Sequence, residues 1–259
     1  MNLIHFRLIS FALLASTASA QDIYLRAIYT QWKPGMQQEG QRFITDVASK
    51  TAVNWLKADA DAVGQVTMSR VLPGGNEIAY DRLRLVMTNK PPTLGGGGQP
   101  GSYLEGTGLT PAEFTGKLNS FMTTVRTEIW QSIYRHGSIK QGDFVQVRMM
   151  DPPAGKTAAF LDYTKNYESA MRAQIVKDGP ATGMEMWRLR LVPEEAADNF
   201  VGLVVYPNSE AVYKSFGNRE ALFRKVHPGK DYHAYREAGD AVTHAVRYVT
   251  YRVDLAAWK

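Results

Sequence analysis

Apolar and polar residues alternate along two stretches of the chain, and each stretch precedes a turn rich in proline and glycine. The first stretch covers residues 22–29 and is followed by Pro34-Gly35; the second covers residues 143–149 and is followed by residues 152–155. Alternation with a period of two is typical of a half-buried β-strand, and Pro-Gly sequences are typical of turns. We therefore expect a strand at the start of each half of the chain.

Apolar residues recur at helical spacing after each of these turns. In the first half the recurring positions are Phe43, Ile44, Val47, Ala48, Thr51, Ala52, Trp55 and Leu56. In the second half they are Phe160, Tyr163, Thr164, Tyr167, Met171 and Ile175. A spacing of three to four residues places such side chains on one face of a helix. Each helix is expected to pack this face on a sheet.

A hairpin and a closing strand follow in each half. The alternation returns, with turn residues between the members of each pair, over residues 64–71 with 78–87 and residues 183–192 with 200–206. Alternating runs also end the two halves, over residues 125–134 and 244–255. Strand pairs joined by short segments that contain proline or glycine are typical of antiparallel hairpins. We therefore predict four strands in each half.

One more helix is predicted between each hairpin and the closing strand. Thr110 and Glu113 have the spacing of a capping box, and Pro111 occupies the first helical position. In the second half, residues 208–210 begin the corresponding helix. The order in each half is then β-α-β-β-α-β, the ferredoxin-like order, in which an antiparallel sheet carries helices on one face only.

The predicted fold class is α+β, with two tandem ferredoxin-like repeats over residues 21–138 and 139–259. A Gly- and Pro-rich segment at residues 89–108 has no counterpart in the second half. It is interpreted as a surface loop, with a lid over a binding site as the alternative. The helix-free face of each sheet needs cover. We expect the two antiparallel sheets to pack face to face, so that one chain forms a pseudo-dimeric α/β barrel.

Sorting with a period of two gives the predicted strands two unlike faces. The aliphatic face includes Leu25, Leu85, Val125, Ile129 and Val147, and we expect it to contact the helices. The opposite face carries arginine and aromatic residues on strand after strand, and we expect it between the two sheets. The candidate ligand-binding residues on this second face are Tyr24, Arg26, Tyr80, Arg82, Arg84, Arg126, Glu128, Trp130, Arg148, Arg188, His244 and Tyr248.

Arginines outnumber acids on the candidate face, where Glu128 is joined at most by Asp81 or Glu185. A guanidinium buried without a partner is unfavourable, so water or an anionic ligand must supply the missing charge. A guanidinium binds carboxylate or phosphate well, and the tyrosines with Trp130 suit a flat body. We therefore predict a binding module for a small flat anionic or aromatic molecule. In the alternative, the arginines pair and stack between the sheets and hold the barrel together without a ligand.

Short pieces at residues 126–130 and 142–144, together with the order of elements, give the chain a resemblance to the dimeric α/β-barrel superfamily, and more loosely to its tandem, exported members of unassigned role. The resemblance implies enzymes as the alternative function: cofactor-free mono-oxygenation of polycyclic phenols, haem degradation or chlorite-dismutase-like haem chemistry. For haem it implies His244 or another histidine as axial ligand with an arginine nearby. For the cofactor-free reaction it implies that Trp130, the tyrosines and Arg126 orient the substrate. The short pieces contain no catalytic motif of the superfamily.

The first twenty residues have the layout of a signal peptide. Arg7 precedes an apolar run at residues 8–15, and residues 18–20 are small, as cleavage before Gln21 requires. The apolar run is too short to span a bilayer, and no later segment is long enough. We therefore expect an exported protein, periplasmic or secreted, that has no membrane span and is a monomer or homodimer.

Composition removes several classes of function. The chain has 259 residues, a net charge of +5 and no cysteine, which excludes disulfides and thiolate catalysis. Its charges are well mixed, unlike the basic patch of a nucleic-acid-binding protein, although salt-sensitive attachment to anionic envelope material is a further alternative. Residues 151–157 lack the first glycine of a phosphate-binding loop, a Gly-x-Ser-x-Gly motif is absent, and the histidines are not spaced as a metal pair. No cofactor and no metal are predicted.

Overall fold

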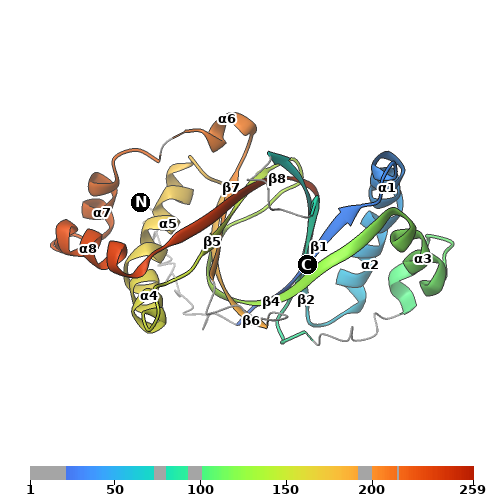
Figure 1. The fold of residues 1–259 in the computed structure, drawn as a ribbon, viewed down its shortest axis with the longest axis horizontal. Helices are drawn as coiled ribbons and strands as arrows, with labels where there is room; N and C mark the ends of the chain where they lie inside the picture. Colours follow the sequence, from blue (N-terminus) through green and yellow to red (C-terminus); the bar gives the residue numbers. More distant parts are fainter. Residues whose placement is uncertain (1–21, 73–79, 93–100, 192–199, 215) are drawn as a thin grey trace, which may run out of the picture.

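The computed structural model describes residues 22–72, 80–92, 101–191, 200–214 and 216–259. Within them, eight strands pair in antiparallel fashion into one closed barrel (Figure 1). The strands are β1 (Tyr24–Trp32), β2 (Ala62–Leu72), β3 (Arg82–Thr88), β4 (Met122–Gly137), β5 (Phe144–Met150), β6 (Gly183–Leu191), β7 (Phe200–Tyr206) and β8 (Ala245–Trp258). Their order around the barrel is β1-β3-β2-β8-β5-β7-β6-β4.

Helices cover the outside of the barrel on two opposite flanks (Figure 1). On one flank lie α1 (Gln37–Phe43), η1 (Ile44–Ala48, a π-helical turn), α2 (Ser49–Ala58), η2 (Gly101–Leu104, a 3-10 turn) and α3 (Pro111–Phe121). On the other lie α4 (Thr157–Tyr163), η3 (Thr164–Glu168, a π-helical turn), α5 (Ser169–Asp178), α6 (Ser209–Val212), α7 (Arg219–Val226) and α8 (Tyr232–Val242). None of the helices in the described ranges has the length and apolar character needed to cross a membrane.

The predicted α+β class and antiparallel barrel are confirmed. β3 lies between β1 and β2, and β7 lies between β5 and β6, while the β2–β8 and β4–β6 pairs close the barrel. The helix predicted to begin at residues 208–210 is instead three short helices, because Asn208, Asn218 and Asp231 each cap a new helix with a side-chain oxygen. The predicted signal peptide and residues 93–100 of the predicted loop lie outside the described residues.

The two faces of the barrel are the reverse of the prediction. One cluster of buried residues with members on all eight strands fills the lumen, and it includes Leu25, Leu85, Val147 and Val201. These belong to the aliphatic set that we expected against the helices. An eight-stranded barrel is just wide enough for its side chains to fill the interior, so water is excluded there and guanidinium groups are unfavourable. The arginine-bearing face therefore lies outside, under the helices.

β4 is the exception to this reversal. Leu25, Ala27 and Tyr29 point into the lumen, and the register of β1 with β4 places Trp130, Glu128 and Arg126 opposite them. The carboxylate of Glu128 accepts hydrogen bonds from the Tyr29 hydroxyl at 2.9 Å and from the Trp130 Nε1 at 2.8 Å, and it pairs with Arg126. This part of the predicted face therefore does lie between the two halves of the barrel, as a packed polar cluster.

Candidate functional site

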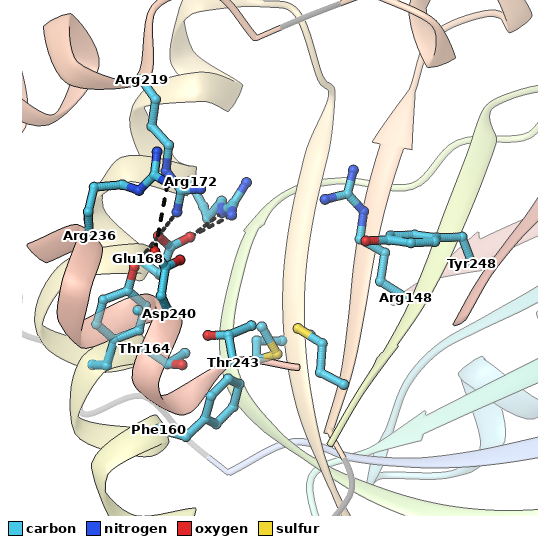
Figure 2. A pocket seen from close by; sticks show the side chains of 14 residues that line it. Arg148, Phe160, Thr164, Glu168, Arg172, Arg219, Arg236, Asp240, Thr243 and Tyr248 are labelled. Carbon is cyan, nitrogen blue, oxygen red and sulfur yellow. Dashed lines mark hydrogen bonds and ion pairs between the residues drawn. The ribbon is translucent and has the colours of Figure 1, made fainter. Parts of the chain in front are cut away.

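A cavity of about 360 Å³ lies between the outer face of the barrel and the helices of residues 157–242 (Figure 2). We call it the second-half cavity. β5 and β8 contribute Arg148 and Tyr248 on one side, and the helices contribute a charged cluster on the other. The residues that line it are Arg148, Met150, Phe160, Tyr163, Thr164, Glu168, Arg172, Met186, Arg219, Arg236, Gly239, Asp240, Thr243 and Tyr248.

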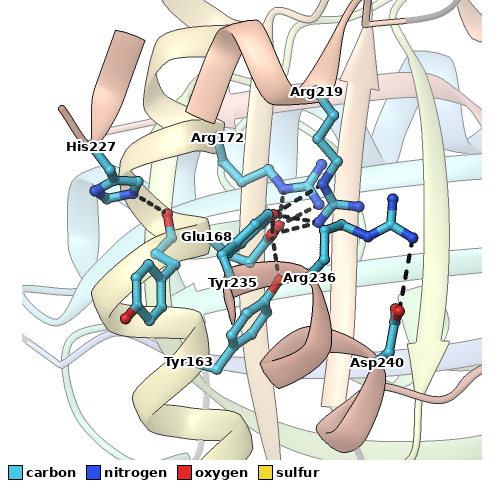
Figure 3. Close-up of polar contacts among 9 residues, drawn as sticks. Tyr163, Glu168, Arg172, Arg219, His227, Tyr235, Arg236 and Asp240 are labelled. Atoms are coloured by element: carbon cyan, nitrogen blue, oxygen red, sulfur yellow. Dashed lines mark hydrogen bonds and ion pairs between the residues drawn. The ribbon is translucent and has the colours of Figure 1, made fainter. Parts of the chain in front are cut away.

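Glu168 organises the charged cluster on the helical side (Figure 3). Its carboxylate accepts from the Nε of Arg172 at 2.8 Å and from the Nη2 of Arg219 at 2.7 Å. The hydroxyl of Tyr163 donates to it at 3.2 Å, and the hydroxyl of Tyr235 donates as well. One buried carboxylate thus holds two guanidinium groups in fixed positions at the cavity.

The charges of this cluster are stable at neutral pH. Burial by itself raises the pKa of Glu168, but Arg172 and Arg219 outweigh that effect and lower the pKa to about 2. Burial likewise lowers the pKa of Arg172, whereas Glu168 raises it above its ordinary value. Because the two arginines share one carboxylate, the cluster keeps a net positive charge that faces the cavity.

Arg148 faces this cluster from the barrel wall. Its Nε donates to the amide oxygen of Gln146 at 2.8 Å, and its guanidinium lies over the ring of Tyr248, 5.6 Å from the centroid. No carboxylate of the described residues pairs with Arg148. Arg236 lies across the cavity and is 3.8 Å from the carboxylate of Asp240, both side chains being exposed. Four arginines therefore line a cavity that holds two acids.

The deep end of the cavity is apolar. Met150, Met186 and Phe160 line it, and Phe160 packs on Phe200 with ring centroids 4.5 Å apart. A smaller hollow of about 50 Å³ continues from it toward Tyr134 and shares Arg148 and Arg172 with it. The cavity thus combines a cationic opening with an apolar base, which suits a ligand with an anionic group and a flat apolar body.

A π-helical turn brings the cluster to the cavity. The helix of residues 157–178 would place its side chains with a period of 3.6, but η3 inserts a wider turn between α4 and α5. Thr164 and Glu168, at the two ends of that turn, both line the cavity. Such turns rotate the following side chains relative to a regular helix and recur at functional sites.

Two of the twelve predicted site residues, Arg148 and Tyr248, line the second-half cavity. Arg82 and Arg84 line a different cavity, under the helices of residues 37–121. The lumen cluster takes Arg126, Glu128 and Trp130, with Tyr80 packed beside it. Four more lie apart: Tyr24 and Arg26 on the outer side of β1, Arg188 against Phe200, and His244, which is exposed and precedes β8. The structure does not bring the predicted set together.

Sequence reasoning missed the helical half of the site. None of the predicted site residues is among Glu168, Arg172, Arg219, Arg236 and Asp240. Two of the pairs carry a signal, because Glu168 with Arg172 and Arg236 with Asp240 are oppositely charged residues four positions apart. That spacing shows that two charges meet on a helix, but it does not show that they face a sheet.

The cavity does not provide an imidazole for haem. None of the histidines in the described residues lines it. His227 is buried, but its Nε2 lies 3.1 Å from the backbone oxygen of Tyr167 (Figure 3). Two phenols line it, Tyr163 and Tyr248. Burial followed by the charge of Glu168 raises the pKa of Tyr163, so its hydroxyl stays protonated and is a poor metal ligand. The described residues also contain no group of three or more acids or histidines that could hold a metal ion.

Comparisons with known proteins define the fold and not the chemistry. No protein-family model matches the chain, and no curated protein matches it in sequence. A protein of Lactobacillus acidophilus NCFM, provisionally named a monooxygenase, has a similar structure with a TM-score of 0.56 and 12% identity, covering 92% of this chain and 96% of its own. A provisionally named monooxygenase of Fusobacterium nucleatum is similar with a TM-score of 0.58 and 9% identity, covering 93% of this chain and 95% of its own. The chain therefore shares its fold, an antiparallel barrel with helices on two flanks, with these two proteins over nearly their whole length.

Proposed function

We propose that this protein binds a small organic anion with a flat apolar body in the second-half cavity. The observation that carries the proposal is the charge balance of the cavity wall, where four arginines face two acids. One of the four, Arg148, has no carboxylate partner within the described residues, although a cavity wall is partly removed from water. A bound carboxylate or phosphate supplies the missing negative charge.

In the proposed complex, each part of the cavity contacts a different part of the ligand. The anionic group meets the guanidinium of Arg148 and the shared charge of Arg172 and Arg219, since planar guanidinium groups accept a carboxylate in two parallel hydrogen bonds. The ring of Tyr248 and the apolar base at Met150 and Phe160 contact the body of the ligand. The same residues discriminate against cations.

Binding is favoured over catalysis by the state of the buried carboxylate. A cofactor-free oxygenation would need a group that removes a proton from the substrate. Glu168 has a pKa of about 2 and is fully engaged by two arginines and two tyrosines, so it is a weak base. Trp130, which the superfamily resemblance implied as a substrate-orienting residue, is fully buried in the lumen. Oxygen uptake with a polycyclic phenol, measured on the purified protein, tests this alternative, and uptake that depends on the protein would establish it.

The binding proposal is tested by calorimetric titration of 2-naphthoate into the purified protein. We expect binding that weakens as salt is raised, no binding of the cation 2-naphthylmethylammonium, and at least tenfold weaker naphthoate binding in Arg148→Gln. Arg224→Gln is the matched control, because Arg224 is exposed, pairs with Glu220 and lines neither this cavity nor the one under the helices of residues 37–121. Failure of the wild type to bind naphthoate and related aromatic acids, or equal binding by Arg148→Gln, would contradict the proposal.

We also propose that the two halves of the chain are tandem repeats and that the chain is exported as a monomer or homodimer. The same order of strands in both halves of the barrel supports the first point. The residue pattern before Gln21 supports the second. Cell fractionation with N-terminal sequencing tests export, for which a mature chain beginning at Gln21 is expected. Light scattering on the purified protein gives the number of subunits.

A further inference from the structure

A second cavity lies on the opposite flank, under η1, α2 and α3, and has a volume of about 190 Å³. We call it the first-half cavity. The sheet side carries Arg82 and Arg84 from β3, and the register places Arg84 between Ile28 of β1 and Thr67 of β2. The helical side is mostly apolar and includes Ile44, Phe114 and Leu118. This cavity does not depend on the site described above.

The two arginines of this cavity differ in how their charge is balanced. Arg82 is almost fully buried, and its Nη2 lies 3.2 Å from the carboxylate of Asp254. It also donates to Gln41 and lies over the ring of Trp32, 4.8 Å from the centroid. Burial lowers the pKa of Arg82 to about 10, and its Nη2 makes no hydrogen bond, but the carboxylate of Asp254 balances its charge.

Arg84 lacks such a partner. Its Nη2 donates to the neutral amide of Gln65 at 2.8 Å, and its Nε is buried without a hydrogen bond. Burial, and then the like charge of Arg26, lower the pKa of Arg84 to about 10, so the group stays charged at neutral pH in an environment that disfavours its charge. No carboxylate of the described residues pairs with it. A charge kept at a cost to stability indicates a function rather than a structural role.

The first-half cavity occupies the same place in its flank as the second-half cavity does in the other. Each lies between the sheet and a helix that a π-helical turn interrupts, and residues of that turn line each cavity: Ile44 and Ala48 here, Thr164 and Glu168 there. The chemistry differs at this point. Where the second-half cavity has Glu168 and further arginines on its helices, the first-half cavity has aliphatic and aromatic side chains.

We propose that the first-half cavity binds a small aliphatic carboxylic acid, with the carboxylate on Arg84 and the hydrocarbon against Phe114 and Leu118. Thr67, opposite Arg84 on the neighbouring strand, and Thr30 also line the cavity, and their hydroxyls provide further donors for the carboxylate. The volume is below the ~300 Å³ at which pockets for drug-sized ligands begin, so the ligand is a short or medium-chain acid rather than a polycyclic one.

Titration of octanoate into the purified full chain tests this proposal, followed by calorimetry and by the NMR signal of the ¹³C-labelled carboxylate. We expect octanoate to bind and octan-1-ol to bind at least tenfold more weakly, because the alcohol lacks the charge that Arg84 requires. Arg84→Gln should reduce octanoate affinity at least tenfold and remain folded, since it removes an unbalanced charge. Its melting temperature should equal or exceed that of the wild type.

A second variant tests whether octanoate occupies this cavity without changing Arg84. Ala48→Leu enlarges a side chain of the π-helical turn that lines the cavity, leaves Arg84 in place and should also reduce octanoate affinity at least tenfold. Naphthoate binding in the second-half cavity should be unchanged in both variants, and Arg224→Gln should bind octanoate as the wild type does. The proposal is overturned if millimolar octanoate does not bind. It is equally overturned if Arg148→Gln abolishes octanoate binding while Arg84→Gln retains it, because the acid then occupies the other cavity.

Discussion

Buried charges in this protein are of two kinds, and the difference lies in what surrounds each residue. Glu168 is surrounded by two guanidinium groups and two tyrosine hydroxyls, so its ionised form is favoured by the fold. Arg84 is buried with one neutral acceptor and a neighbouring arginine, so burial first and then the like charge disfavour its ionised form. Glu168 therefore stabilises the folded state, whereas we propose that a bound ligand of opposite charge balances Arg84.

Glu168 makes the free energy of unfolding depend on pH in the acid range. Its pKa is lowered to about 2 from 4.5, so its contribution is fully present above pH 4.5 and is lost as the pH falls toward 2. A shift of that size corresponds to about 3 kcal/mol of unfolding free energy, as an order of magnitude. We expect urea unfolding at pH 7 to give a higher free energy of unfolding for the wild type than for Glu168→Gln. The difference between the two should shrink below pH 4.5.

The control for this prediction is Glu220→Gln, which removes an exposed carboxylate that also pairs with an arginine four residues away. Exposed pairs of this kind contribute at most about 1 kcal/mol. A gap between wild type and Glu168→Gln that stays constant from pH 7 to pH 3 would show that the carboxylate is not the group that titrates.

Helix boundaries decide which residues face each cavity, and the chain sets them with short local signals. The capping box that the sequence predicts at Thr110 is present: Thr110 Oγ1 accepts from the backbone N of Glu113 at 3.3 Å, and the Glu113 carboxylate accepts from the backbone N of Thr110 at 2.8 Å. The helix that begins there, α3, carries Phe114 and Leu118 into the first-half cavity.

Removal of this cap should act on one cavity and not on the other. Thr110→Ala loses the side-chain acceptor and is expected to lower unfolding free energy by about 1 kcal/mol. Because fraying of the first turn of α3 displaces Phe114, octanoate affinity should fall while naphthoate affinity does not. Ser120→Ala, in the last turn of the same helix, removes an exposed hydroxyl that bonds to Lys117 and serves as the control. Equal effects of the two substitutions would contradict the role of the cap.

The sequence predicts the order of elements across the molecule, but not the direction in which each strand faces. Period-two sorting correctly separates Arg84 from Leu85 and Arg148 from Val147. It does not tell which set fills the lumen, because the alternation is the same for both sets and helices can cover either face of the sheet. The deciding factor is a property of the closed barrel: a dry interior accepts aliphatic side chains and excludes unpaired guanidinium groups. β4 departs from the rule because Glu128 balances Arg126 within the lumen.

Contacts between residues that are far apart in the sequence explain the other site residues that were not predicted. Glu168 meets Arg219 and Tyr235 only because α7 and α8 pack against the helix of residues 157–178. The π-helical turn that positions Glu168 has no recognisable signal in its residues, which read as a regular helix. The candidate site is thus predicted where it lies on strands, at Arg148 and Tyr248, and is missed where it lies on helices.

The reversal of the barrel faces makes a prediction at the scale of the whole molecule. Leu85 and Val125 both belong to the aliphatic set that the sequence assigns to the helices, yet Leu85 is fully buried in the lumen and Val125 is 44% exposed. Leu85→Ala opens a void among side chains from strands of both halves and should lower unfolding free energy by about 2–5 kcal/mol. Val125→Ala should change it by no more than about 0.5 kcal/mol. Urea unfolding of the two variants measures these changes in free energy, and hydrogen exchange shows which strands are affected. If the arginines filled the lumen, Leu85 would contact the helices of one flank only. Leu85→Ala would then leave hydrogen-exchange protection in the other half of the chain unchanged. In the observed barrel, strands from both halves should lose protection together.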